Sequence, residues 1–382
     1  MNSLRNHPGI CWTERFVLFL LLLHIGLHTL PRAWGSLITD FPNYYLVARL
    51  VHEGVDTSRL YEWTWIEREK DHRSIDVRGT GLTPLTPSST LLMWPLAGLA
   101  PLSAKHVWIL TNLLSLLPLG WLLQSMTGLG YRRIALAFAS SVPLYRNLEL
   151  GQLYLFLLLL ITAACWAYLR GFCALAGGLI ALAAACKVFP VLFFVFFLQR
   201  RNWRALISGV ITGTVAITIP IAAFGWNMHR TYLHEILPWA LHGAGLQPYQ
   251  VGASLPGILH YLPQWNPHPW HYSPLCYALL LSTIQMLLMA PAILFIRSVG
   301  STRERVLMEW SALLTATLAI STFPAVYNFV LMVFPICVVA AELLRRRWYP
   351  WIAVLLAAYL GIGLRLPSPH RMKSYCMFRG FH

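Results

Sequence analysis

Apolar runs of about twenty residues recur along the whole chain, separated by short polar segments. They include residues 16–34, 106–124, 153–169, 205–224, 277–296 and 349–364. A run of this length forms a helix that can cross the hydrocarbon core of a bilayer. The pattern therefore predicts an all-α polytopic membrane protein, one integral-membrane unit over residues 1–382, with roughly ten to twelve transmembrane helices.

The first apolar run is followed by a segment of different character, residues 35–87, which we expect to form a large extracytoplasmic loop. It holds eight of the fourteen acidic residues of the protein, interleaved with basic ones. A segment so charged cannot cross lipid, yet apolar residues recur at helical spacing over residues 41–51. This spacing predicts an amphipathic helix lying at the membrane surface.

Two later apolar stretches are interrupted. Residues 88–102 contain Pro95 and Pro101, which favours a re-entrant segment over a span. Residues 174–198 contain Lys187 and Pro190, which predicts two short helices meeting at a bend. A second extracytoplasmic loop is expected over residues 225–271 and a basic tail over residues 365–382.

Composition and charge agree with a membrane protein. The chain is 57% hydrophobic and 11% charged, with a mean hydropathy of +0.58, which excludes a soluble protein. Its net charge of +15 comes from short basic clusters beside helix ends. Such clusters mark cytoplasmic loops rather than a nucleic-acid surface. If the helices alternate strictly across the membrane, the basic tail falls outside, where the positive-inside rule does not expect it. The side of the membrane on which the tail lies therefore stays open.

Cysteine and histidine usage gives no sign of a metal. The seven cysteines are scattered without metal-ligand spacing, so we expect neither a disulfide framework nor a metal site. His24 and His28 are four residues apart in the first span, but with no third ligand nearby they indicate helix packing. The apolar N-terminal run lacks a small-x-small cleavage site and predicts an uncleaved signal anchor.

Asp40 is the first carboxylate after the first span, just beyond the expected outer face of the membrane. A carboxylate there can take the proton of an acceptor hydroxyl during group transfer. Aspartate before Pro42 is also typical of a helix N-cap. Position alone leaves both interpretations open.

Lys187 is a lone ammonium within an apolar stretch, which is costly unless it meets an anion or a water-lined cavity. A substrate phosphate would supply that anion. The alternative is a side chain that extends to the interface. Arg146, Asn147 and Gln152 form a polar cluster at an expected outer helix boundary, although Arg146 could instead pair with Glu149.

Four short motifs, in order and spacing, resemble glycosyltransferase family 87. They are Asp-Phe-x-x-Tyr-Tyr from Asp40, a proline-rich turn before Pro95-Leu96-Ala97, Gly151-Gln152 opening a helix, and Lys187-x-x-Pro190. Each motif is degenerate alone; together with weaker matches they extend to about Pro335. The resemblance implies the GT-C fold and an inverting transfer from a β-linked polyprenyl-phosphate sugar, with Asp40 as base. Asp56 and Asp76 compete with Asp40 in the same loop.

The resemblance also implies residues that bind the substrates. Tyr44 and Tyr45 belong to the Asp40 motif, and Gln250 and Ser254 lie in a polar patch of the second loop, where turn and cap roles are the alternative. Apart from the resemblance, Arg49 is expected, with Lys187 and Arg146, to stabilise the phosphate released from the donor. Tyr327 and Asn328 match a turn in which family members often carry Asp or His after the aromatic residue. Asparagine cannot titrate, which leaves Asp40 as the main base candidate.

The sequence thus predicts an enzyme of the plasma membrane with its site on the extracytoplasmic face. It would move a sugar, mannose by the resemblance, from a polyprenyl-phosphate donor to a glycan or glycolipid acceptor. No cofactor is expected, and the absence of a nucleotide-binding loop agrees with a lipid donor. A transporter or lipid flippase is the main alternative, and a structural assembly protein without catalysis is a third.

Overall fold

The computed structural model describes residues 8–55, 59–75, 85–241, 255–261, 273–296, 302–322 and 325–362, and these ranges contain helices and no strand. Five helices are long and apolar enough to cross a membrane: Trp12–Gly35, Pro101–Thr127, Trp203–Phe224, Leu275–Phe295 and Val326–Arg346. Four shorter apolar helices accompany them: Tyr154–Leu169, Cys173–Cys186, Phe189–Gln199 and Tyr349–Gly361. The predicted all-α polytopic membrane protein is confirmed.

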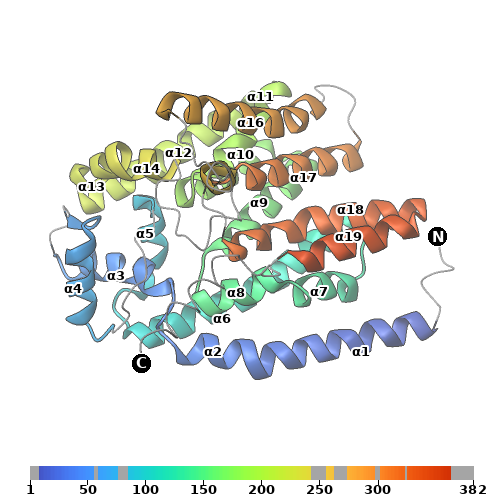
Figure 1. The fold of residues 1–382 in the computed structure, drawn as a ribbon, viewed down its shortest axis with the longest axis horizontal. Coiled ribbons are helices and arrows are strands. Elements are labelled where there is room, and N and C mark those ends of the chain that lie inside the picture. The colour runs from blue at the N-terminus through green and yellow to red at the C-terminus, as the bar shows by residue number, and fades with distance from the viewer. Residues whose placement is uncertain are drawn as a thin grey trace, which may run out of the picture.

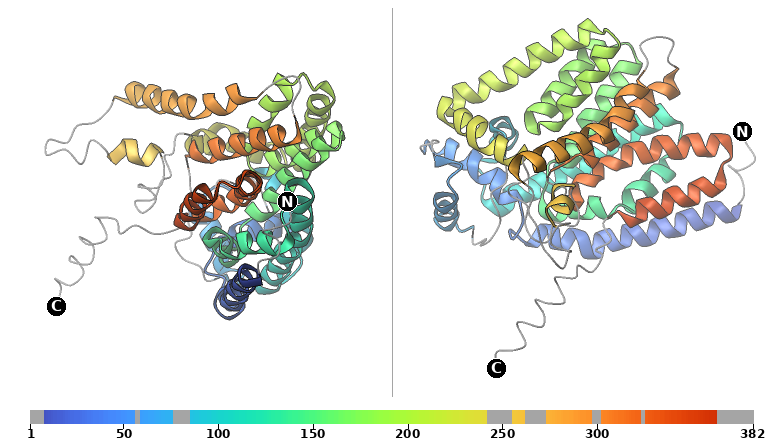
Figure 2. Two further views of the ribbon diagram at one scale, coloured as in Figure 1. Left: turned by 90° about the vertical axis from the view of Figure 1, so that its right-hand side faces the viewer. Right: turned by 45° about the horizontal axis from the view of Figure 1, so that its top comes forward.

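The spans differ from ideal rods because the backbone changes its winding within them. The first comprises α1 (Pro8–His24), a π-helical turn η1 (Ile25–Thr29) and α2 (Leu30–Gly35). The others are α6 (Pro101–Thr127), α12 (Trp203–Phe224), α16 (Pro274–Phe295), and the 3-10 helix η8 (Val326–Met332) continued by α18 (Val333–Arg346). Figure 2 shows α16 beside α17 (Arg303–Ala319) along one side of the bundle.

Several apolar stretches are broken into pieces, so the described residues contain fewer full-length spans than the roughly ten to twelve helices expected from the whole sequence. Residues 131–150 form α7 (Tyr131–Ala139) and α8 (Val142–Leu150), separated at Ser140 and Ser141. The predicted bend near Lys187 is confirmed: α10 (Cys173–Cys186) ends there, and η4 (Phe189–Phe193) and α11 (Phe194–Gln199) follow. Two further apolar helices are α9 (Tyr154–Leu169) and α19 (Tyr349–Gly361).

Residues 88–102 do not form a span. They contain α5 (Pro87–Met93), the 3-10 turn η3 (Trp94–Leu96) and the start of α6 at Pro101. Seven helical residues rise only about 10 Å, far less than the thickness of a bilayer. A short segment that enters and leaves on one side, as predicted, fits this length.

The helix predicted just after Asp40 is present as α3 (Phe41–His52), but it does not lie on the surface. Nine of its residues are buried, on all sides of the helix. The reason is that α5, η3 and α6 pack against it, so its tyrosines are covered by protein. The exposed amphipathic helix of this loop is instead α4 (Trp63–Asp71).

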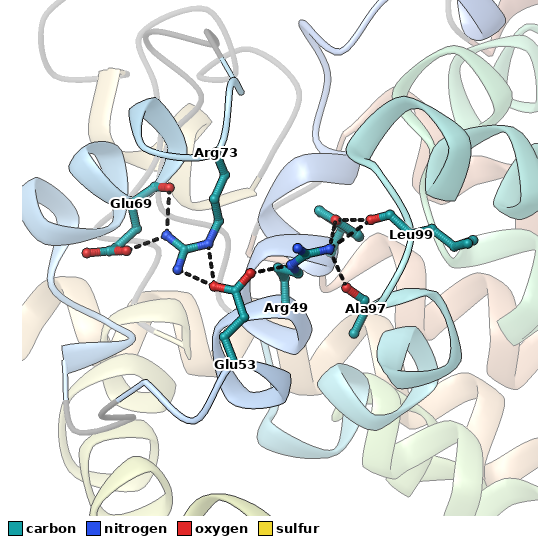
Figure 3. Close-up of polar contacts among 7 residues, drawn as sticks. Arg49, Glu53, Glu69, Arg73, Ala97 and Leu99 are labelled. Carbon is teal, nitrogen blue, oxygen red and sulfur yellow. Dashed lines mark hydrogen bonds and ion pairs between the residues drawn. The ribbon is translucent and has the colours of Figure 1, made fainter.

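An ionic cluster ties α3 and α4 together, as Figure 3 shows. Glu53, just after α3, pairs with Arg49 of α3 and with Arg73 just after α4. Arg73 also pairs with Glu69 of α4. Arg49 further donates to the carbonyl oxygens of Ala97 and Leu99, at 3.0 and 3.1 Å, in the turn before α6. Helices α3 and α4 are therefore fastened to each other and to the turn before α6.

The two ends of the bundle differ in character. In Figure 1, α3, α4, α5, α13 (Trp226–Thr231) and α14 (Leu237–Leu241) gather at the left end, whereas α1 begins at the right. At that right end Glu14 of α1 accepts from Arg132 (2.6 Å) and Arg133 (3.0 Å) of α7. The Arg132-Arg133 cluster thus lies at the other end of the bundle from α3 and α4 (Figure 1). The π-turn η5 (Tyr232–Ile236) joins α13 to α14, and α15 spans Leu255–Tyr261.

Candidate active site

Asp40 lies in the linker between α2 and α3, directly before α3, which is at the left end of the bundle in Figure 1. It occupies the N-cap position of α3, but its side chain makes no capping hydrogen bond. Its Oδ2 instead accepts a hydrogen bond of 2.5 Å from Nε2 of Gln152. The carboxylate is thus directed at a residue more than a hundred positions away in sequence, and the N-cap alternative does not describe its side chain.

Gln152 connects Asp40 to α3. Its Oε1 accepts a hydrogen bond of 2.8 Å from the hydroxyl of Tyr44, while its Nε2 donates to Asp40. Both Gln152 and Tyr44 are almost completely buried. A buried amide with both ends bonded has one orientation available, so Gln152 fixes the carboxylate in place.

Gly151 explains why Gln152 can reach Asp40. It ends α8 in the left-handed conformation with a φ of 66°, which glycine adopts without strain. A Cβ added to Gly151 would lie 2.7 Å from the Cβ of Phe41, the first residue of α3. The turn between α8 and α9 and the residue beside Asp40 are therefore in close contact.

We expect Gly151→Ala to cost about 2 kcal/mol or more of unfolding free energy, from backbone strain and from the clash with Phe41. Transfer activity should fall with it, because the Gln152–Asp40 contact depends on this approach. Thermal unfolding in detergent and an activity assay would check both. A matched control is Gly120→Ala in α6, where a Cβ would meet nothing within 4 Å; equal losses in the two variants would contradict the argument.

Lys187 lies directly after α10, in extended backbone. Its Nζ is 5.8 Å from the centroid of the Tyr154 ring, and that ring is 5.5 Å from the ring of Tyr327. The hydroxyl of Thr86 donates to the carbonyl of Ala185 at 2.6 Å, which anchors the end of α10 to α5. Lys187 is close enough to Asp40 to interact with it electrostatically. The two groups therefore share one site.

The pKa of the Asp40 carboxyl is raised above its ordinary value of 3.8, chiefly because the group is buried. Hydrogen bonds from Gln152 and Tyr327 and the positive charges of Lys187 and Lys70 act in the opposite direction and offset part of the rise. A carboxylate with a raised pKa is a stronger base than a solvated one. Proton abstraction near neutral pH benefits from such a group.

The sequence did not single out Lys70, which the structure places among the charges acting on Asp40. It lies on α4 with its side chain 1% exposed, and its Nζ is 2.7 Å from Oε1 of Glu67. In the sequence it is one of many interleaved charges in the first loop. Only its burial distinguishes it, and burial follows from the tertiary packing of α4.

Other residues predicted to bind substrate are engaged elsewhere. The hydroxyl of Tyr45 donates to the carbonyl of Leu99 (2.5 Å), and Arg49 belongs to the ionic cluster described above. Arg146 pairs with Glu149 at 2.8 Å, the alternative that the sequence left open. These three side chains hold the loop and the helices in place, and nothing in the structure directs them at Asp40.

Asn147 and Asn328 are both buried, on α8 and η8, two helices that pack together. Neither polar atom of the Asn147 side chain has a hydrogen-bond partner. Gln250 and Ser254 lie outside the described residues, as do the competing carboxylates Asp56 and Asp76. The predicted roles of all these residues stay predictions.

No group of three or more metal-ligating side chains occurs in the described part of the chain. The rings of His24 and His28 are 5.1 Å apart, and the ring of Tyr145 is 5.6 Å from that of His24. This is an aromatic contact between α1, η1 and α8.

Comparison with known proteins gives one family. The family model for glycosyltransferase family 87 matches residues 86–324, which is more than half of the chain. The match includes Gly151, Gln152 and Lys187, and it begins after Asp40. No curated protein and no solved structure matches the chain.

Proposed function

The chain belongs to glycosyltransferase family 87. We propose that it transfers a sugar, which we expect to be mannose, from a polyprenyl-phosphate donor to a glycan or glycolipid acceptor. The observation that carries the proposal is a buried carboxylate, Asp40, with the positive charge of Lys187 near enough to act on it, within a bundle of apolar helices. A base for the acceptor and a cation for the phosphate are the two groups that this reaction requires.

In the proposed reaction the acceptor hydroxyl oxygen attacks C1 of the donor sugar from the face opposite the phosphate. Asp40 takes the hydroxyl proton as the new C1–O bond forms, and Gln152 and Tyr327 hold the carboxylate through their hydrogen bonds. The bond between C1 and the phosphate oxygen breaks, and polyprenyl phosphate leaves with the electron pair. Attack from the opposite face inverts the configuration at C1.

Lys187 supports a phosphate donor rather than a neutral one. Negative charge accumulates on the phosphate oxygens as the C1–O bond breaks, and an ammonium held nearby stabilises it. The contact with the Tyr154 ring keeps the ammonium in place without neutralising it. The cation thus remains available to an anion.

The distribution of charge supports an extracytoplasmic site. Helix α7, which begins at the basic cluster Arg132-Arg133, lies at the end of the bundle opposite α3 (Figure 1), and both arginines bind Glu14 of α1. Basic clusters face the cytoplasm in plasma-membrane proteins. The site end would then face outward, where lipid-linked sugars are used in place of nucleotide sugars.

The test is transfer by purified protein in lipid nanodiscs, supplied with radiolabelled polyprenyl-phosphate mannose and a glycolipid extract. We expect label in the acceptor fraction with this donor and none with a nucleotide-linked mannose. Transfer from the nucleotide donor would contradict a lipid-linked substrate. Movement of the donor across a vesicle bilayer with no transfer to any acceptor would favour the flippase alternative.

The raised pKa of Asp40 predicts a pH dependence. The base acts only when ionised, so kcat/KM should fall as the pH is lowered through the pKa of Asp40, and the midpoint should lie above the ordinary carboxyl value of 3.8. Gln152→Leu removes a hydrogen bond that lowers this pKa, so its midpoint should move to still higher pH. A pH–rate profile of both proteins checks this, and an unshifted midpoint in Gln152→Leu would contradict it.

A further inference from the structure

Lys105 is a completely buried cation on α6 that the proposed reaction does not use. Its Nζ donates to the carbonyl oxygen of Ser36 at 2.5 Å and to that of Glu149 at 3.1 Å. Burying an ammonium is costly and is tolerated where polar partners replace its hydration. Here those partners are backbone carbonyls, so the side chain fixes the positions of two chain segments.

The two segments are those that carry the hydrogen-bonded pair of the site. Ser36 begins the linker that ends at Asp40, and Glu149 lies in the last turn of α8, three residues before Gln152. One helical turn beyond Lys105, the indole of Trp108 donates to the carbonyl of Gly151 at 3.0 Å. One face of α6 therefore holds both the linker and the turn between α8 and α9.

We propose that Lys105 is a positioning residue of the transferase site, whose ammonium sets the distance between the Asp40 linker and the Gln152 turn. Its two hydrogen bonds hold these segments from α6, and the Gln152–Asp40 hydrogen bond of 2.5 Å joins the same two segments. Lys105 acts through Asp40 and Gln152 without touching substrate. The inference deepens the proposed function and rests on it for its catalytic consequence.

If Lys105 only filled space in the core, an uncharged side chain of the same size would serve as well. A methionine of similar length would fill the same space, but it would leave the carbonyls of Ser36 and Glu149 without a donor. No proline stiffens the linker between Ser36 and Asp40, so contacts hold its conformation. The ammonium supplies one of these contacts, at Ser36, and binds α8 at Glu149 from the same point.

The site holds few other charges that could disguise the effect. Charged and titratable groups that act on Asp40 come from α4, α3, α9, η8 and the residue directly after α10; they are Lys70, Tyr44, Tyr154, Tyr327 and Lys187. Lys105 itself is faced by Glu149, whose carboxylate pairs with Arg146. The charges that act most strongly on Asp40 are those of Lys187 and Lys70, so removal of Lys105 should reach Asp40 chiefly through geometry.

The experiment follows the ionisation of Asp40 directly, without turnover. In difference infrared spectra recorded over a pH series, the protonated carboxyl band of Asp40 is identified by its loss in Asp40→Asn. In Lys105→Met we expect the midpoint of this band to move up by about one pH unit, because the hydrogen bond from Gln152 to the carboxylate is weakened. In the same variant kcat should fall about 10-fold or more with KM little changed.

Three further variants separate positioning from stability. Lys105→Arg retains a cation and donors and should restore part of the midpoint. Trp108→Phe removes one donor and should shift the midpoint in the same direction by less. Ile109→Ala, a buried apolar change on the same helix, should lower thermal stability and leave the midpoint unchanged.

An unshifted infrared midpoint in folded Lys105→Met would overturn the inference, and so would an equal shift in Ile109→Ala. If Lys105→Met does not fold, Trp108→Phe decides by the same measurement. A wild-type protein without transferase activity would remove the proposed function, yet the infrared result would still report whether Lys105 positions the carboxylate.

Discussion

Asp40→Asn is expected to lower kcat for sugar transfer by about 10³-fold, the contribution typical of a positioned general base. Asparagine has nearly the same shape, and its side-chain oxygen can still accept the hydrogen bond from Gln152. The variant therefore removes the basic group while retaining its surroundings. The measurement is the rate of label transfer from polyprenyl-phosphate mannose at saturating donor.

The thermal stability of Asp40→Asn serves as a control for the predicted loss of activity. Because the pKa of Asp40 is higher in the folded protein than in the unfolded chain, the ionised carboxylate destabilises the fold at neutral pH. Asp40→Asn should then unfold at the same temperature as the wild type or higher. Asp71→Asn, an exposed carboxylate at the end of α4, is the matched variant and should retain full activity. Full transfer by folded Asp40→Asn would exclude Asp40 as the base.

The elements of this fold that could be predicted are those that depend on local sequence. Apolar runs predicted the long helices, and the pair Lys187 and Pro190 predicted the bend after α10, because lipid and helix geometry act on each segment separately. The burial of α3 could not be predicted in this way. Its helical spacing is visible in the sequence, but whether lipid or protein covers it depends on where α5 and α6 pack.

The residues of the candidate site also fall into those predictable from local sequence and those that depend on tertiary packing. Gly151 and Gln152 are visible in the sequence as a pair before a helix, and the structure adds that Gly151 also ends α8, in close contact with Phe41 where only glycine fits. Lys70 and Lys105 were not singled out, since a lysine in a charged loop and a lysine near a helix start are ordinary in sequence. Their burial depends on contacts with segments far away in the chain. Arg146 shows the converse, because its partner Glu149 is local and was predictable.

Lys187→Met is expected to lower kcat about 10²-fold or more, because the leaving phosphate loses the cation that stabilises its developing charge. KM for the lipid donor should rise less than kcat falls, since the charge on the phosphate grows in the transition state and the lipid chain contributes most of the ground-state binding. Lys187→Arg retains the charge and should recover part of the rate. Steady-state kinetics over a range of donor concentrations separate the two parameters.

The fold should tolerate this change, which makes the loss of rate interpretable. Lys187 sits over the Tyr154 ring in apolar surroundings, where methionine packs at least as well as an ammonium. The matched control is Arg170→Met, which removes a cation placed 5.6 Å over the ring of Trp166 at the opposite end of α9; it should leave transfer unchanged. If both variants lose rate equally, the effect is one of general charge or stability. If neither does, Lys187 does not contact the phosphate, and the donor is held by another group.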